Sequence, residues 1–290
     1  MAQVTVGVLH PGEMGASVGA AARRGGADVV WASQGRGAST RARAVADGLR
    51  DVGTLQNLVK VSDVIVSVCP PGAAADVARA VAGYRFSRVY VDANAVSPET
   101  ARQVGATVEQ GGATFVDGGI IGPPARSAGN TRMYLSGPAA RQVAPLFQDG
   151  PLEVIVLDGG AGAASALKVA FASYTKGTMA LLMAIRAFAR AEGVDAALVK
   201  EWEHSLPGLP GQCEGAVRGS ARKAWRFVGE MEEIAQAFLT VGLPGGFHRA
   251  AADLYRRLER YKDTDQPPSL AEATAVILQL RQCDKEPRLR

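Results

Sequence analysis

A glycine-containing turn near the start of the chain has the residue types and spacing of a phosphate-binding loop. It reads His10-Pro-Gly12-Glu-Met-Gly15 and follows a β-rich run at residues 4–9. The dinucleotide fingerprint GxGxxG would place glycines at positions 10, 12 and 15, and only the first is replaced here. The second glycine lets the backbone approach a pyrophosphate, to which the following helix offers free N–H groups. A tight turn that binds no nucleotide is the alternative. The cofactor contacts that we expect from this turn are His10, Pro11, Gly12, Glu13 and Met14.

The segment after the second β-rich run, residues 28–31, indicates which dinucleotide is bound. An NAD site normally carries Asp or Glu there, which bonds the ribose 2′-OH. This chain continues ASQGR, without an acid. Ser33 can donate a hydrogen bond to a 2′-phosphate, and the planar fork of Arg36 can pair with it, with Thr40 and Arg41 nearby. We therefore predict NADP(H); the alternative is that Arg36 is an ordinary solvated loop residue.

Cys69 and Pro70 follow a continuous apolar run at residues 63–68. Ligands of open α/β sheets bind at the carboxyl ends of the strands, so we expect both residues to line the nicotinamide-ribose region. Cys69 could be mistaken for a nucleophile. No histidine stands near it in sequence, which favours a packing role.

Short β-rich runs alternate with helical segments through the first half of the chain. This alternation predicts parallel strands joined by right-handed crossovers. The strands of this alternation are expected at residues 4–9, 28–31, 63–68 and 89–92. Three more strand candidates follow at residues 114–121, 132–135 and 154–157. The expected helices are residues 14–24, 40–47, 76–81 and 98–110, with one more that begins near Pro138.

From residue 161 onward the pattern is almost entirely helical. Residues 161–191 are apolar nearly all round, which indicates one long helix buried on most sides. Glycine- and proline-rich turns separate the helices that follow. We predict an α/β protein with an N-terminal Rossmann-type domain at residues 1–158. An all-α C-terminal domain at residues 159–290 would follow, joined through the long helix.

The composition argues against several classes of protein. The net charge of +4 is spread along the chain without basic blocks that contain aromatics, so we expect no nucleic-acid partner. The three cysteines are far apart and suggest neither a disulfide framework nor a zinc site, and no metal is expected. The chain start lacks the features of a signal peptide, and no uncharged stretch approaches the ~18–20 apolar residues of a membrane helix. We therefore expect a cytoplasmic protein.

Four segments resemble motifs of the β-hydroxyacid dehydrogenase and 6-phosphogluconate dehydrogenase superfamily, which includes imine reductases. The turn at residues 10–15 resembles its GLGxMG motif, and DANAVSP at residues 92–98 is similar to its D-x-S-T-x-S-P segment. DGGIIG at residues 117–122 occupies the place of its D-A-P-V-S-G substrate loop, and Gly162 with Lys168 is similar to its GxGxxxK motif. The resemblance implies a Rossmann domain, a helical C-terminal domain for substrate binding, and an interlocked homodimer.

The resemblance assigns Lys168 the role of catalytic acid/base. A free lysine has a pKa of about 10.4, and burial beside the nicotinamide would lower it toward ~7–8. The alternative is a lysine whose stem packs while its ammonium reaches solvent. Thr175 falls on the same helix face, where a substrate contact and a packing role are equally open. The expected substrate contacts are Asn94, Gly119, Ile120, Gly122 and Thr175, and Asn94 is also expected to contact the cofactor.

The chain departs from the family pattern at three positions. Ile121 replaces a serine that holds a substrate carboxylate, Ala172 replaces an asparagine, and Asn94 replaces a hydroxyl residue. The favoured hypothesis is an NADP(H)-dependent oxidoreductase that transfers hydride between nicotinamide and a small hydroxy or carbonyl substrate. An imine reductase is the nearest alternative: the changed substrate loop favours it, but such enzymes typically carry Asp or Tyr in place of Lys168. A non-catalytic NADP-binding sensor is the alternative from another class.

Overall fold

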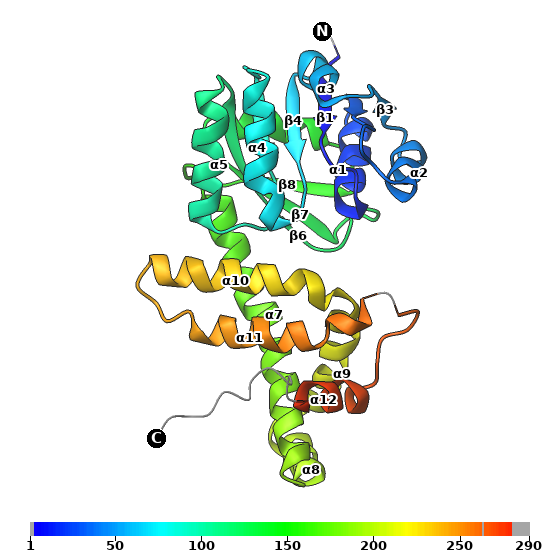
Figure 1. The fold of residues 1–290 in the computed structure, drawn as a ribbon, viewed down its shortest axis with the longest axis vertical. Coiled ribbons are helices and arrows are strands. Elements are labelled where there is room, and N and C mark those ends of the chain that lie inside the picture. Colours follow the sequence, from blue (N-terminus) through cyan, green and yellow to red (C-terminus); the bar gives the residue numbers. More distant parts are fainter. Residues whose placement is uncertain (1–2, 263, 280–290) are drawn as a thin grey trace. The chain divides into compact units, whose positions relative to one another are not determined.

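The computed structural model describes residues 3–262 and 264–279, and the chain divides into two compact units, residues 1–170 and 171–290. The first unit is built on one eight-stranded sheet with the strand order β3-β2-β1-β4-β5-β6-β7-β8 (Figure 1). Its strands are β1 (Thr5–Val8), β2 (Asp28–Trp31), β3 (Arg50–Asp51), β4 (Val64–Ser67), β5 (Val89–Asp92), β6 (Thr114–Ile121), β7 (Thr131–Ser136) and β8 (Leu152–Val156).

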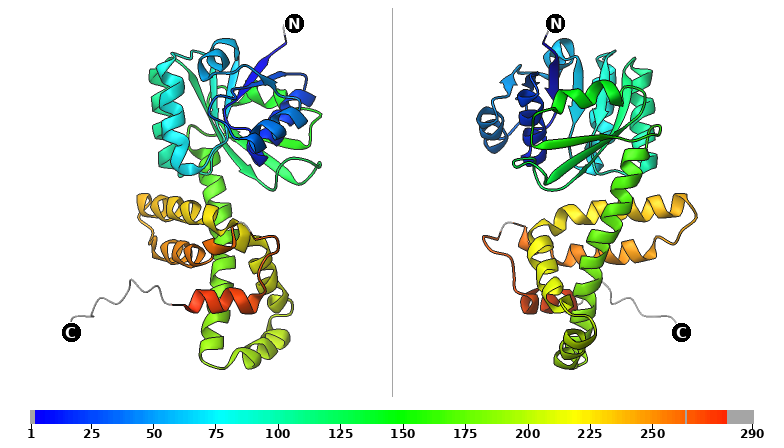
Figure 2. Two further views of the ribbon diagram at one scale, coloured as in Figure 1. Left: turned by 45° about the vertical axis from the view of Figure 1, so that its right-hand side comes forward. Right: turned by 180° about the vertical axis from the view of Figure 1, so that it is seen from behind.

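Helices cover both faces of this sheet (Figures 1 and 2). Strand β4 shows why both are needed, because Val64 and Val66 face one apolar core while Ile65 faces another. Helix α1 and turn η2 pack on the first core, whereas α3, α4 and α5 pack on the second. The helical segments of this unit are α1 (Glu13–Arg24), α2 (Ala38–Ala46), α3 (Leu55–Val61), α4 (Ala74–Gly83), α5 (Pro98–Gln110) and α6 (Ala140–Val143), with turns η1 (Pro71–Ala73) and η2 (Ala144–Phe147).

The last two strands run opposite to the rest of the sheet, and the sequence pattern predicts no direction for them. β7 is antiparallel to β6, and β8 is parallel to β7. The connection between Ile121 and Thr131 explains the antiparallel pairing, since a parallel crossover needs a dozen or more residues and usually a helix.

Two short elements were not predicted. β3 has two residues, too few to show an alternation, and it pairs with the end of β2. Helix α3 is seven residues long and is capped by Thr54, whose side chain accepts a hydrogen bond from the Asn57 N–H. Both elements lie between β2 and β4, where they bring an additional loop to the carboxyl end of the sheet.

The described residues of the second unit contain helices and turns. Helix α7 (Ala163–Ala191) begins in the first unit and continues into the second, and the division after Ala170 therefore falls within it. The sequence analysis places the domain boundary in the loop before this helix. The remaining helical segments are α8 (Asp195–Ser205), α9 (Leu209–Ser220), η3 (Ala221–Lys223), α10 (Ala224–Thr240), α11 (Gly246–Arg257), η4 (Glu259–Tyr261) and α12 (Leu270–Leu278).

The core of the second unit forms around α7, α10 and α11. α10 and α11 lie side by side (Figures 1 and 2), and Met183, Met231 and Tyr255 are fully buried. The Tyr255 hydroxyl donates to the Lys176 carbonyl at 2.7 Å and so ties α11 to α7. Over the described residues, every helix is too short or too polar to traverse a lipid bilayer.

Candidate active site

The turn between β1 and α1 leaves open space for a ligand at its second glycine. Gly12 is the N-cap of α1 and has no capping side chain, so the first N–H groups of the helix remain available. A Cβ at Gly12 would find no atom within 4 Å, whereas a Cβ at Gly15 would lie 2.1 Å from the His10 carbonyl oxygen. Gly12 thus leaves room for a pyrophosphate, and Gly15 is required for the close packing of helix on strand.

The other residues predicted in this turn lie around the same space. Pro11 is buried, and its carbonyl accepts from Arg43 Nε at 3.5 Å. Glu13 is exposed at the first position of α1, and Met14 is half-buried behind it. The geometry fits the phosphate groups of a dinucleotide at the helix N-terminus.

Three arginines lie around the loop between β2 and α2. Arg36 Nη2 is 2.8 Å from His10 Nε2, and Arg41 donates to the carbonyl oxygens of Ser33 at 2.9 Å and Arg36 at 3.2 Å. Arg43 Nη2 donates to a threonine hydroxyl of its own helix at 3.3 Å. These partners are an imidazole, backbone carbonyls and a hydroxyl, so none of these contacts neutralises a guanidinium charge. The loop is suited to an anionic group such as a 2′-phosphate.

The structure also brings an acid to this loop, which the sequence analysis missed. Asp51 at the end of β3 accepts hydrogen bonds from the N–H groups of Ser33 at 3.2 Å and Gly53 at 2.8 Å. Partial burial alone would raise the pKa of Asp51, but a hydrogen bond from the Ser33 side chain, then those from the two N–H groups, and finally the charge of Arg41 lower it overall. The signal was weak because Asp51 follows β2 by twenty residues and joins it only through a two-residue strand.

Asn94 connects the loops that follow β4 and β5. Its Nδ2 group donates to Asp92 Oδ2 at 2.8 Å and to Ser67 Oγ at 3.2 Å, and its Oδ1 accepts from the Cys69 N–H at 2.5 Å. An asparagine amide has two donors and two acceptor lone pairs. The amide, which is buried, therefore holds the two loops together.

Cys69 and Pro70 lie at the carboxyl end of β4, as predicted. Burial, followed by the nearby Asp92, raises the pKa of the Cys69 thiol to about 11. The thiol is therefore protonated near neutral pH, which supports a packing role over a nucleophilic one. Pro70 is exposed just before η1.

Lys168 lies in the second turn of α7, against the end of β6. Its Nζ donates to the Ile120 carbonyl oxygen at 2.5 Å. A Cβ at Gly119 would lie 2.6 Å from the Ala164 carbonyl oxygen and 3.2 Å from Lys168 Cβ. The glycine therefore permits the close approach of α7 to β6 that places the lysine beside Gly119 and Ile120.

The start of α7 is capped by side chains that are distant in sequence. Asp117 of β6 accepts hydrogen bonds from the Ser165 N–H at 3.0 Å and the Ser165 hydroxyl at 2.6 Å. Ser136 of β7 accepts from the Ala164 N–H at 3.1 Å and donates to Asp117 at 3.2 Å. Asp117 is fully buried and favourably placed at a helix N-terminus. Asp117 belongs to the DGGIIG segment, whose sequence pattern alone does not indicate this capping role.

The remaining predicted substrate contacts lie in different parts of the chain. Gly122 directly follows β6 with φ +124°, and a Cβ there would lie 2.3 Å from the Asn130 carbonyl oxygen, so the turn requires glycine. Thr175 belongs to the second unit, and its hydroxyl donates to the Phe171 carbonyl at 3.1 Å. Ile121 and Ala172, which replace polar family residues, are both buried.

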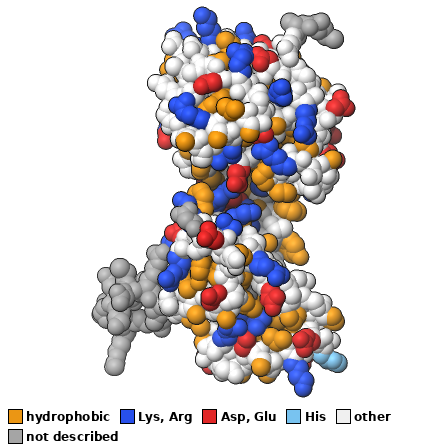
Figure 3. Space-filling model, turned by 90° about the vertical axis from the view of Figure 1, so that its right-hand side faces the viewer, with side chains coloured by type: hydrophobic (Ala, Val, Ile, Leu, Met, Phe, Trp, Pro, Cys, Tyr) orange, Lys and Arg blue, Asp and Glu red, His pale blue; other side chains and the backbone are white. Residues whose placement is uncertain are grey.

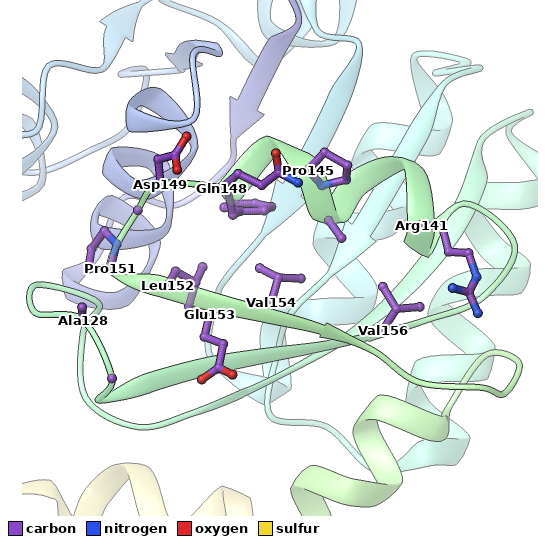
Figure 4. Close-up of a pocket in the computed structure, with 14 residues that line it drawn as sticks. Ala128, Arg141, Pro145, Gln148, Asp149, Pro151, Leu152, Glu153, Val154 and Val156 are labelled. Atoms are coloured by element: carbon purple, nitrogen blue, oxygen red, sulfur yellow. The ribbon is translucent and has the colours of Figure 1, made fainter.

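A separate pocket of about 620 Å³ lies beside the edge strand β8 (Figure 4). Figure 4 shows Val154 and Val156 pointing toward the segment that carries Pro145 and Gln148, with Glu153 on the other side of the strand. The pocket contains none of the predicted site residues, and nothing in its lining indicates a ligand.

Comparison with protein families matches both parts of the chain. A family model described as the NAD binding domain of 6-phosphogluconate dehydrogenase matches residues 5–150. A second model, a domain of unknown function (DUF1932), matches residues 189–258. An uncharacterized 28.5 kDa protein of Methanothermus fervidus, encoded in the 5′ region of 7S RNA, is 29% identical over 238 residues, which is 80% of this chain and 90% of that protein.

Solved structures of similar fold include dehydrogenases and reductases. A conserved protein of unknown function, reported to be structurally similar to 3-hydroxyacid dehydrogenases, is 26% identical with a TM-score of 0.67 and covers 89% of this chain and 99% of its own. The 3-hydroxyisobutyrate dehydrogenase of Mycobacterium tuberculosis, solved with L-serine, is 19% identical with a TM-score of 0.69, covering 95% and 98%. A reductive aminase of Aspergillus terreus, solved with NADPH, cyclohexanone and allyl amine, is 18% identical with a TM-score of 0.55, covering 95% and 99%.

Proposed function

The chain belongs to the family of the NAD-binding domain of 6-phosphogluconate dehydrogenase, and we propose that it is an NADP(H)-dependent oxidoreductase of the β-hydroxyacid dehydrogenase type. The observation that carries the proposal is the placement of Lys168 against the carboxyl end of β6. Ligands of open α/β sheets bind at this end, where the β1–α1 turn and the loops after β4 and β5 also lie.

The dinucleotide would lie along the carboxyl ends of β1, β2 and β4. The N–H groups at the start of α1 would bind its pyrophosphate, beside His10, Pro11, Gly12, Glu13 and Met14. Cys69, Pro70 and Asn94 would line the nicotinamide-ribose region. A bound nicotinamide supplies hydride transfer.

The loop after β2 supports the phosphorylated form of the cofactor. Ser33 and Arg36 would bind the 2′-phosphate, with Arg41 and Arg43 adding positive charge. Asp51 is the feature that favours NAD instead, because a carboxylate there would repel a 2′-phosphate and could accept from a 2′-OH. Its carboxylate already accepts hydrogen bonds from the Ser33 and Gly53 N–H groups. We therefore expect the positive charge of the three arginines to outweigh the negative charge of Asp51.

Lys168 would move the proton that accompanies hydride transfer. As the neutral amine, its Nζ would accept the hydroxyl proton in alcohol oxidation, and as the ammonium it would donate a proton in carbonyl reduction. The Ile120 carbonyl orients the ammonium group without neutralising it. Asn94, Gly119, Ile120, Gly122 and Thr175 are the proposed neighbours of the substrate.

Imine reduction is the second candidate activity. Family members carry a carboxylate-binding serine at the position of Ile121. In this chain the position is apolar, and Ile121 is 5% exposed. A site without that serine is better suited to a neutral or cationic substrate than to a hydroxy acid. The reductive aminase of Aspergillus terreus has a similar fold, but at 18% identity this similarity is evidence for the fold alone.

We also propose that the chain forms a homodimer through α7. Tyr174, Leu181 and Phe188 recur every seven residues on this helix, and they are 73%, 44% and 65% exposed. Residues two helical turns apart share one face, so the three side chains form a stripe. Apolar side chains are also visible on the surface of the second unit in Figure 3. A second copy of the chain would cover this stripe.

The cofactor assignment is tested by titrating the purified protein with NADPH and NADH while its tryptophan fluorescence is followed. We expect NADPH to bind at least about tenfold more tightly than NADH. Tighter binding of NADH would overturn the NADP(H) assignment and point to Asp51 as the ribose-binding group. If neither nucleotide bound, the proposal that the protein is an oxidoreductase would be contradicted.

The activity is tested with a panel of 3-hydroxy acids, ketones and cyclic imines. Lys168→Ala should reduce turnover by about 10²–10⁴-fold while leaving the NADPH dissociation constant unchanged. Lys200→Ala is the control, since Lys200 is an exposed lysine of α8. Reduction of imines alone would establish the second candidate. A protein that binds NADPH but turns over no compound, and whose NADPH binding is unchanged by Lys168→Ala, would be a sensor.

A further inference from the structure

The residue that replaces the first glycine of the fingerprint contacts the arginine proposed to select the cofactor. His10 belongs to the β1–α1 turn and Arg36 to the β2–α2 loop, yet Arg36 Nη2 and His10 Nε2 are 2.8 Å apart. A glycine at position 10 would leave the guanidinium without this partner. The substitution therefore links the pyrophosphate turn to the loop that faces the adenosine ribose.

The contact defines the state of the imidazole. A guanidinium has only donors, so Nε2 must accept and the ring proton must be on Nδ1. Burial, with a smaller contribution from the charge of Arg36, lowers the pKa of His10 from 6.5 to about 4. The ring is therefore neutral near pH 7 and can act as the acceptor.

A neutral acceptor differs from a carboxylate because it leaves the charge of the arginine available to a ligand. It fixes the direction of the arginine side chain but does not cancel its charge, and it occupies one of five N–H donors. A carboxylate in the same place would form a salt bridge and compete directly with a phosphate ligand. Arg36 thus keeps a full positive charge in a defined orientation.

The pair also contains polar atoms without partners. His10 Nδ1 and Arg36 Nε are buried and lack hydrogen-bond partners among the residues that the structure describes. Leaving such groups unsatisfied costs free energy, and native proteins rarely do so without a reason. Binding of an anion beside this pair would compensate for that cost.

We propose that His10 is a specificity-determining residue that orients Arg36 toward the 2′-phosphate of NADP(H) while leaving its charge unneutralised. The proposal rests on the NADP(H) assignment made above. It extends that assignment to a residue of the pyrophosphate turn, which by itself would contact NAD and NADP equally.

The test is a double-mutant cycle read out by nucleotide binding. Dissociation constants for NADPH and NADH are measured by fluorescence titration for wild type, His10→Gly, Arg36→Ala and the double variant. Arg36→Ala should weaken NADPH binding about tenfold or more, and His10→Gly about threefold to tenfold, each with little effect on NADH. In the double variant His10→Gly should add nothing to Arg36→Ala, because the histidine acts through the arginine. His10→Gly restores the glycine of the fingerprint, so the turn should fold.

His10→Asp separates orientation from charge. Aspartate would hold Arg36 but neutralise it, so NADPH binding should weaken more than in His10→Gly. An NADPH affinity for His10→Asp equal to that of wild type would overturn the proposal.

Two further outcomes would count against His10 in particular. Equal losses of NADPH and NADH in His10→Gly would mean that the histidine only supports the turn, and additive losses in the double variant would mean that it acts independently of Arg36. Failure of the cofactor assignment itself looks different: wild type would prefer NADH, or Arg36→Ala would not change the preference.

Discussion

At the scale of single residues, Asp92 is a buried acid whose ionisation should affect stability. Burial, more than any other factor, raises the pKa of Asp92 from 3.8 to about 7, and the nearby Asp117 adds to this effect. Between these two values the folded chain holds a proton that the unfolded chain has released. The free energy of unfolding should therefore fall, through this group, as the pH rises from about 4 to about 7.

The measurement is urea unfolding of wild type and Asp92→Asn at several values from about pH 5 to about pH 8. Asparagine does not titrate, so the advantage of wild type over the variant should shrink with rising pH and become constant above about pH 7. The slope should approach ~1.4 kcal/mol per pH unit at most. A difference that does not change with pH would show that Asp92 titrates at an ordinary pKa.

Sequence reasoning was most informative where a residue acts through its own backbone or within a local motif. The open space at Gly12 and the close contact at Gly15 follow from a spacing that is visible in the chain. Asp51 and Asp117 were missed because their partners lie far away in sequence, Asp51 beside Ser33 and Asp117 beside Ser165. Such pairs become visible only when strands and helices have been placed together.

At the scale of elements, the contact between α7 and β6 depends on Gly119. Gly119→Ala would place a Cβ 2.6 Å from the Ala164 carbonyl oxygen, and this backbone atom cannot move without the helix. We expect a loss of roughly 1–3 kcal/mol in the free energy of unfolding, as for other overpacked sites. Because Lys168 lies on the displaced turn, turnover should fall as well.

The matched control is Gly83→Ala near the end of α4. A Cβ at Gly83 would meet no atom within 4 Å, so alanine should be neutral or stabilising by ~0.5–1 kcal/mol. Chemical denaturation of both variants measures the two effects. If Gly119→Ala were as stable as Gly83→Ala, α7 would not require a glycine beneath it.

The elements themselves were predictable to differing degrees. The five strands β1, β2, β4, β5 and β6 lie where β-rich runs predict them. The parallel strand β3 was not predicted, because its two residues are too few to form a β-rich run. The antiparallel direction of β7 was not predicted, because the strand pattern alone does not encode direction, whereas the short connection after β6 does. The length of α7 was predicted to within two residues, since its apolar pattern is continuous.

At the scale of the whole molecule, the exposed stripe on α7 should determine the oligomeric state. Tyr174, Leu181 and Phe188 are too exposed to contribute much to the core of a monomer. Burying such side chains against a second copy of the chain would stabilise the assembly by about 25 cal/mol per Å² of apolar surface. Charges placed within the stripe would have to be desolvated on association, which is costly.

We therefore expect wild type to run as a dimer in light scattering coupled to size-exclusion chromatography, and the double variant Leu181→Glu/Phe188→Glu to run as a monomer with unchanged helical circular dichroism. Val45→Glu is the control, because Val45 on α2 is 74% exposed but lies outside the stripe, so this variant should remain a dimer.

A dimeric double variant would place the subunit contact elsewhere, and a monomeric wild type would contradict the proposed homodimer. If the monomeric variant still bound NADPH but lost turnover, the second subunit would be needed for catalysis and not for cofactor binding. This result would agree with the proposed cofactor site, whose residues all belong to the first unit.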